Sequence, residues 1–157
     1  MTQASFTILG EPKGKGRPRF AKVGKFTKTY TPAQTVMYEN LIAVTYQQQK
    51  QPRFADDEYV EIVIYAYYAI PQSKPKKVKA AMQEGDIRPI KKCDADNILK
   101  IVCDSLNGVA YRDDVQIVDA EVHRYYDVNP RIEVMLRTAE HKKYDKPQGS
   151  TKPFGLE

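Results

Sequence analysis

The sequence predicts a single α/β (α+β) domain, in which a mixed β-sheet packs against helices. Its 157 residues are enough for one domain with a core and too few for two ordinary domains. The expected elements alternate between strands and helices and end on two strands, an order typical of this class. A hydrophobic content of 41% beside 29% charged residues is that of a folded globular protein and not of a disordered chain.

The first half of the chain predicts a strand, a long irregular segment, a helix and a central strand. A short strand is expected at 5–9, followed by a basic segment rich in glycine and proline that should form a long loop or an irregular hairpin. Thr31 as N-cap and Pro32 as first helical residue open a helix over 32–49. The β-branched and aromatic residues of 58–70 run too continuously for an exposed strand and indicate a central one.

The second half predicts two helices and a terminal antiparallel hairpin. A short, very basic helix is expected at 73–85, and a second helix at 94–107, which ends before Gly108. One side of this second helix is apolar and should pack on the core through Ile98, Leu99, Ile101, Val102 and Leu106. Two strands, 115–128 and 131–137, should then pair with each other.

The domain is expected to span 1–138, and residues 139–157, which lack apolar periodicity, are expected to be a disordered tail. No apolar run approaches the ~20 residues that cross a bilayer, and no signal-peptide pattern opens the chain. We therefore expect a cytoplasmic protein that does not associate with membranes. Cys93 and Cys103 match no metal-binding spacing and should be reduced thiols.

Charge is segregated along the chain. Residues 1–30 carry seven basic side chains and one acidic one (+6), and residues 71–92 carry seven and two (+5). Residues 93–121 reverse the sign, with two basic and seven acidic side chains (−5). Basic segments around an acidic one indicate an enzyme that binds a polyanion and holds a cation. The side chains expected to bind the phosphates of such a polyanion are Lys13, Lys15, Arg17, Arg19, Lys74, Lys76, Lys77, Lys91 and Lys92.

Two carboxylates, Asp94 and Asp96, lie where a connector enters the 94–107 helix. A divalent cation would relieve their repulsion, and carboxylate oxygens favour Mg²⁺ or Mn²⁺. Asp94 could instead be a plain N-cap, which would explain one carboxylate but not both. An EF-hand is excluded because Ile98 and Leu99 occupy the positions where that loop needs an oxygen ligand and a glycine.

A second acidic pair, Asp113-Asp114, follows the helix. If the return loop brings this pair back to Asp94 and Asp96, three or four carboxylates could bind one or two ions that activate water; a plain surface turn is the alternative. Lys100 lies one turn from Asp96, and its spacing favours an ion pair worth ~0.3–0.5 kcal/mol over a catalytic role.

The stretch "DADNILKIVCDSLNGVAYRDDVQIVD" resembles the signature of the RusA family of Holliday junction resolvases. That signature reads Asp-x-Asp-Asn-x-x-Lys, then Asp-x-Leu, then Asp-Asp-x-Gln-(Ile/Val)-Val. The N-terminal "KGRPRF" and "YTP" also look like the longer phage and prophage members, so the similarity covers roughly 6–137. Cys93 stands where many members have Pro and Ala95 where Leu is usual; neither change removes a ligand.

The resemblance implies a RusA-like nuclease domain: a metal-dependent endonuclease that acts as a homodimer and nicks two opposed strands of a four-way DNA junction. Carried over residue by residue, it implies catalytic roles for Asp94, Asp96, Lys100 and Asp114. The implied metal ligands are Asp94, Asp96 and Asp114, with Asp113 as a further candidate. The resemblance therefore changes the expected role of Lys100 from a surface ion pair to a catalytic residue.

The leading hypothesis is therefore a crossover junction endodeoxyribonuclease that makes paired nicks through Mg²⁺-activated water, with Mn²⁺ as a possible substitute. One alternative is a protein that binds branched or single-stranded nucleic acid without cutting it. Another is a Mg²⁺-dependent phosphoesterase acting on small nucleotides. Cutting of a four-way junction, or the lack of it, separates the three.

Overall fold

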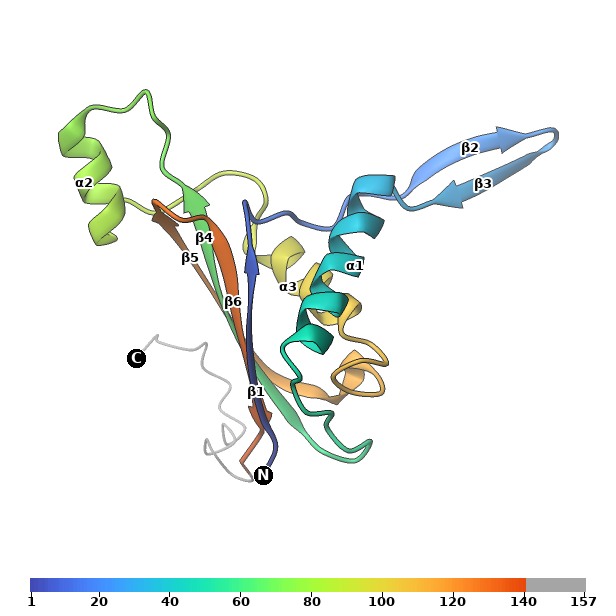
Figure 1. Cartoon of the computed structure of the whole chain (residues 1–157). Helices are drawn as coiled ribbons and strands as arrows, with labels where there is room; N and C mark the ends of the chain where they lie inside the picture. The colour runs from blue at the N-terminus through green and yellow to red at the C-terminus, as the bar shows by residue number, and fades with distance from the viewer. Residues whose placement is uncertain (141–157) are drawn as a thin grey trace, which may run out of the picture.

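A four-stranded mixed sheet forms the centre of the computed structural model, which describes residues 1–140 (Figure 1). The strands lie in the order β1-β6-β4-β5. Their bounds are Gln3–Leu9 (β1), Val60–Ala69 (β4), Ile117–Asp127 (β5) and Arg131–Thr138 (β6). β6 is antiparallel to both β1 and β4, whereas β4 and β5 are parallel. The predicted α+β class with a mixed sheet is confirmed, and β4 is an interior strand as expected.

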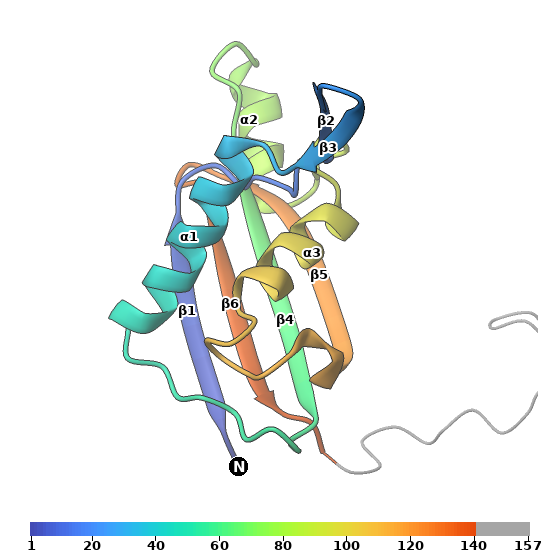
Figure 2. The same ribbon diagram turned by 90° about the vertical axis from the view of Figure 1, so that its right-hand side faces the viewer.

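Two helices cover one face of the sheet (Figure 2). They are α1 (Ala33–Gln48) and α3 (Ala95–Ser105). α1 turns Thr35, Tyr38, Ile42 and Tyr46 inward at intervals of three or four residues, as a helix that packs along one stripe requires. Pro32 is the N-cap of α1, one residue later than the expected Thr31, and no side chain caps this end.

The expected β5–β6 hairpin is wrong, because β4 lies between these two strands. β4 pairs with β5 along one edge and with β6 along the other, so it is an interior strand, and its alternate side chains such as Ile62, Ile64 and Tyr68 are buried in the core. The parallel β4–β5 pair needs a long crossover, and α2 and α3 supply it. The chain leaving β5 then crosses the end of β4 before it enters β6.

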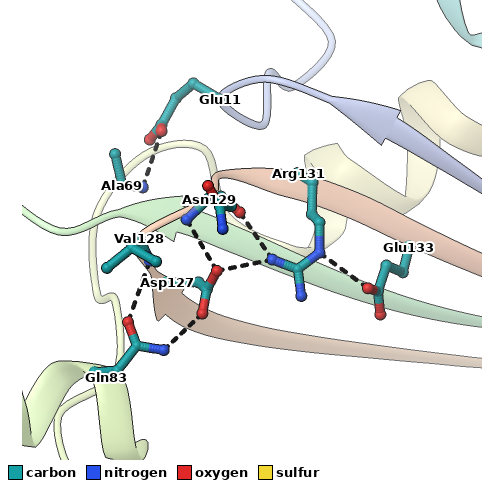
Figure 3. Close-up of polar contacts among 8 residues, drawn as sticks. All are labelled: Glu11, Ala69, Gln83, Asp127, Val128, Asn129, Arg131 and Glu133. Atoms are coloured by element: carbon teal, nitrogen blue, oxygen red, sulfur yellow. Dashed lines mark hydrogen bonds and ion pairs between the residues drawn. The ribbon is translucent and has the colours of Figure 1, made fainter.

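A polar network holds the basic helix α2 (Lys76–Glu84) onto this crossing (Figure 3). The Gln83 amide donates to Asp127 Oδ1 at 2.7 Å and accepts from the Val128 backbone N–H at 3.2 Å. Arg131 donates to Asp127 Oδ2 at 2.9 Å and to Glu133 at 2.9 Å. The network, led by the Gln83 hydrogen bond, lowers the pKa of Asp127 below its usual value. These side-chain hydrogen bonds attach α2 to the turn between β5 and β6, and Met82 is buried beside them.

The basic N-terminal segment forms a two-stranded antiparallel ribbon, here called the basic hairpin (residues 19–30). Its strands are β2 (Arg19–Val23) and β3 (Phe26–Tyr30). Both figures show it projecting beyond the start of α1, at the end of the sheet where α2 also lies. Of the two alternatives for this segment, the hairpin is the one observed.

The C-terminal end of the described chain stays attached to the sheet. The Ala139 N–H donates to the Tyr59 carbonyl at 2.7 Å, and Ala139 is buried. Of the tail expected at 139–157, residues 141–157 lie outside the described residues. Within residues 1–140, no helix has both the length and the apolar character needed to span a bilayer.

Candidate active site

Helix α3 carries the acidic motif and is capped by it. The Asp94 side chain accepts a hydrogen bond from the Asn97 backbone N–H at 3.1 Å, so Asp94 is the N-cap. The opposite side of the helix is buried and anchors it to the core through Ile98, Ile101, Val102, Cys103 and Ser105. The acidic side of α3 is therefore held rigidly toward solvent.

That side presents Asp96, Lys100 and Asp104 at intervals of four residues, as the sequence predicts. Asp96 and Lys100 are exposed, while Asp104 is half-buried. Asp96 and Lys100, both within the described chain, form no ion pair with each other. Eight residues of helix separate Asp96 from Asp104, a rise of about 12 Å.

The Asp113-Asp114 pair has two different structural roles. Asp113 caps a short 3₁₀ helix (Asp114–Gln116), where its carboxylate accepts from the Val115 N–H at 3.2 Å. Gln116 returns the contact by accepting from the Asp113 N–H at 3.3 Å, which completes a capping box. The backbone N–H of Asp114 donates to Asn107 Oδ1 at 2.8 Å. The loop after α3 is thereby folded back onto the last turn of the helix.

This return brings the Asp114 carboxyl close to the Asp104 carboxyl, and we call these two residues the acidic pair. Burial, followed by the neighbouring carboxyls of Asp104 and Asp113, raises the pKa of Asp114 from 3.8 to about 6. Near neutral pH two carboxylates are thus held together against their mutual repulsion. Such an arrangement is relieved by a proton or by a cation.

Lys15 contacts the acidic pair from the N-terminal loop. Its Nζ donates to Asp104 Oδ2 and lies 3.5 Å from Glu39 Oε1 on α1. The hydrogen bond to Asp104 is the main cause of a raised Lys15 pKa. Gly14 allows the loop to approach this closely, since a Cβ there would lie 2.8 Å from Cys93 Cβ and 2.9 Å from Asn97 Cβ.

Part of the predicted site is therefore brought together and part is not. Asp113 and Asp114 do return to α3, but they meet its last turn at Asp104 and not its first turn at Asp94 and Asp96. Among the described residues, no group of three His, Cys, Asp or Glu side chains is placed to hold a metal ion. The acidic pair does fit Mg²⁺ chemically, because this ion commonly takes one or two carboxylates and fills its other positions with water and phosphate.

The residues predicted to bind phosphate are exposed with one exception. Lys15 is the exception, because Asp104 and Glu39 occupy its ammonium group. Lys91 is partly engaged as well, 3.8 Å from Glu11 and above the Tyr68 ring at 5.5 Å. The exposed positions are Lys13, Arg17, Arg19, Lys74, Lys76, Lys77, Lys91 and Lys92.

The sequence does not single out Asp104 or Gln116 as site residues, and it gives no sign that Lys15, a predicted phosphate contact, pairs with Asp104. Asp104 could have been found, since it shares the α3 stripe with Asp96. Gln116 ties the acidic loop to the segment before β4 by donating to the Ala55 and Glu58 carbonyls at 2.9 and 3.1 Å. No local signal marks the partner of Lys15, which lies 89 residues away.

Comparisons with known proteins agree with the motif. The family model described as endodeoxyribonuclease RusA matches residues 10–137. "Uncharacterized protein YqaN" of Bacillus subtilis (strain 168) is 35% identical over 134 residues, which cover 84% of this chain and 94% of that protein. The match includes the whole of α3, the acidic pair and the basic hairpin. The chain belongs to the RusA family of endodeoxyribonucleases.

Proposed function

We propose that this protein is a Mg²⁺-dependent endodeoxyribonuclease that resolves four-way DNA junctions by paired nicks in opposed strands. The observation that carries the proposal is the acidic pair, with the pKa of Asp114 raised to about 6 in a member of this family. Two carboxylates held together suit an ion that is shared with a phosphodiester.

Asp104 and Asp114 are the proposed ligands at the end of α3. When bound, the ion would supply an activated water and stabilise charge that develops on the phosphate. Asp94 and Asp96 remain proposed ligands because of the resemblance, at the other end of the same helix face. Lys100 lies between the two ends and is proposed to neutralise the phosphate or the leaving oxygen.

We also propose that two copies act together, since paired nicks require two sites. The sheet face opposite α1 and α3 supports this, because of the described helices only α2 reaches it, at the end where Arg88, just after α2, lies over the Tyr125 ring (Figure 1). It carries Tyr65 stacked on His123 at 4.9 Å, Tyr67 stacked on Tyr125 at 6.2 Å, and Met135, which is 47% exposed. A half-buried aromatic face of this kind suits a subunit contact.

The test uses three substrates with the purified full chain: a synthetic four-way junction, a linear duplex of the same sequence and a nucleoside triphosphate. Each is incubated with and without Mg²⁺, and the junction is labelled on all four strands. Nicks in two opposed strands of the junction alone, only with Mg²⁺, are the expected result. Sedimentation of the protein should report a dimer.

Two other outcomes would refute the proposal. Junction binding without nicks in Mg²⁺ or Mn²⁺ would indicate a non-catalytic DNA-binding protein. Phosphate release from the triphosphate, with the junction left intact, would indicate a nucleotide phosphoesterase. Asp96→Asn should abolish cutting and preserve junction binding; loss of binding to the same degree would make Asp96 structural.

A further inference from the structure

The basic hairpin is an exposed arm that packs mainly on itself. Its ten strand residues are exposed except Ala21, which is half-buried. Figures 1 and 2 show the ribbon leaving the body of the protein beyond the start of α1. Five residues per strand give it a reach of about 17 Å. Isolated two-stranded ribbons are marginally stable in water, so this shape suggests that the ribbon has a binding partner.

The tip of the arm is apolar. Gly24, with φ +63°, and Lys25 form the two-residue turn, and the register pairs Val23 with Phe26 directly beside it. Directly paired residues point to the same face of the ribbon, so these two side chains form one apolar knob. Phe26 is 79% exposed and Val23 is 60% exposed. Nothing in the described chain buries this knob.

The shaft behind the tip is cationic. On the face that carries the knob, Lys28 pairs with Ala21 and Arg19 pairs with Tyr30; Lys22 lies on the opposite face. No acidic residue occurs anywhere from 12 to 38, a stretch that holds seven lysines and arginines. Because the arm is strongly positive, a nucleic acid is a far better partner for it than a neutral or basic protein surface.

We infer that the basic hairpin is a strand-opening arm, whose Val23–Phe26 tip inserts between bases at a DNA branch point while its shaft binds the flanking phosphates. Apolar side chains that enter a base step unstack it, and the cost is lowest where bases are already poorly stacked, as at a branch. Aromatic side chains stack on any base, which suits a junction of unspecified sequence. The inference rests on the proposed function, because it takes branched DNA as the substrate.

The test places 2-aminopurine at the branch point of a four-way junction and measures binding and fluorescence with Ca²⁺ in place of Mg²⁺. Wild-type protein should increase the fluorescence as the base unstacks. The variant Val23→Ser/Phe26→Ser should lose that increase and bind the junction about tenfold more weakly, with duplex binding changed less than twofold. Val118→Ser, an exposed apolar change at the start of β5, is the matched control and should behave as wild type.

A second variant separates insertion from charge. Lys22→Ala/Lys28→Ala should weaken junction and duplex binding alike. The slope of log binding constant against log salt concentration should become shallower by about one unit per lysine, while the fluorescence increase at saturation persists. Because all four side chains are exposed, unchanged thermal melting should confirm that each variant folds.

Three results would overturn the inference: no fluorescence change with wild type, unchanged junction affinity of the tip variant, or dissociation of a dimer by the tip variant without DNA. The last would make a second copy of this chain the partner of the arm. Failure of the proposed function is distinguishable. If the protein opens the junction in Ca²⁺ but never cuts it in Mg²⁺, the strand-opening arm stands and the nuclease proposal fails. If the protein cuts the junction and its tip variant cuts and binds normally, the nuclease proposal stands and the arm fails.

Discussion

The carboxyl groups of Asp104 and Asp114 lie close together, although the two residues are ten positions apart in the chain. The hydrogen bond from the Asp114 N–H to Asn107 closes the loop that brings them together. Lys15 compensates the charge of Asp104, but it forms no ion pair with Asp114 within the described chain. Asp114 is therefore the less compensated member of the pair.

Replacing Asp114 should stabilise the protein in the absence of divalent cations. The pKa of Asp114 is raised in the folded state, so the folded protein binds more protons than the unfolded chain between about pH 4 and 6, and stability falls as pH rises through that window. At pH 7.5 without divalent cations, Asp114→Asn should be about 1–2 kcal/mol more stable than wild type, measured by urea unfolding. The difference should vanish near pH 4.

Divalent cations should reverse this difference. Mg²⁺ bound by the acidic pair would raise the melting temperature of wild type by mass action, and much less that of Asp114→Asn. Equal stabilisation of both proteins by Mg²⁺ would show that the ion binds elsewhere, for example at Asp94 and Asp96.

Asp113 and Asp114 should respond differently to substitution, because only Asp113 is a helix cap. Asp113→Ala removes the cap of the 3₁₀ helix and should cost about 1 kcal/mol in unfolding free energy. Asp113→Asn keeps a capping oxygen and removes a charge that raises the pKa of Asp114, so it should be at least as stable as wild type and should cut normally. Were Asp113→Asn to lose cutting while melting normally, Asp113 would be a ligand as well as a cap.

Lys15 should contribute to the stability of the fold and contribute little to the salt dependence of DNA binding. Its ammonium group is held by Asp104 and lies near Glu39, so Lys15→Ala should leave the salt dependence of junction binding unchanged. Lys13→Ala, two residues away and exposed, is the matched control. It should reduce the slope of log binding constant against log salt concentration by about one unit.

A double-mutant cycle of Lys15→Ala and Asp104→Ala should give a coupling of about 1 kcal/mol by thermal or urea unfolding. A coupling near zero, together with a reduced salt slope for Lys15→Ala, would instead assign Lys15 to the phosphate-binding surface.

Gly14 should tolerate no side chain. A Cβ at this position would lie under 3 Å from the Cβ atoms of Cys93 and Asn97, so Gly14→Ala should cost about 1–3 kcal/mol in unfolding free energy and displace Lys15. Gly10→Ala is an informative comparison. Its Cβ would meet nothing within 4 Å, and its cost of about 1 kcal/mol would come from the positive φ alone. Equal costs at both positions would argue against close packing of the loop on α3.

Much of the fold follows from local sequence patterns. The N-cap Asp94 and the Asn107-Gly108 stop bracket α3 to within two residues, and the continuous apolar run of β4 indicates its interior position. The pairing partner of β5 could not be predicted in the same way. A short turn between two strands favours a hairpin. Here β4 lies between the two strands instead, and the order of strands is decided by the packing of the whole sheet.

The candidate site shows the same division. Spacing along a helix places Asp96, Lys100 and Asp104 on one stripe, and the structure agrees. Which end of that stripe Asp114 reaches depends on the path of the return loop. That path is set by the hydrogen bond that Asn107 accepts from the Asp114 N–H and by the one that Gln116 donates to the Ala55 carbonyl. Such contacts carry no periodic signal.

The most direct test of the account compares wild type, Asp113→Asn and Asp114→Asn on a four-way junction labelled on all strands, in Mg²⁺. The account predicts nicks in two opposed strands by wild type and Asp113→Asn, and at least a hundredfold less cutting by Asp114→Asn with junction binding retained. Normal paired nicking by Asp114→Asn would contradict the central claim that the acidic pair binds the catalytic cation.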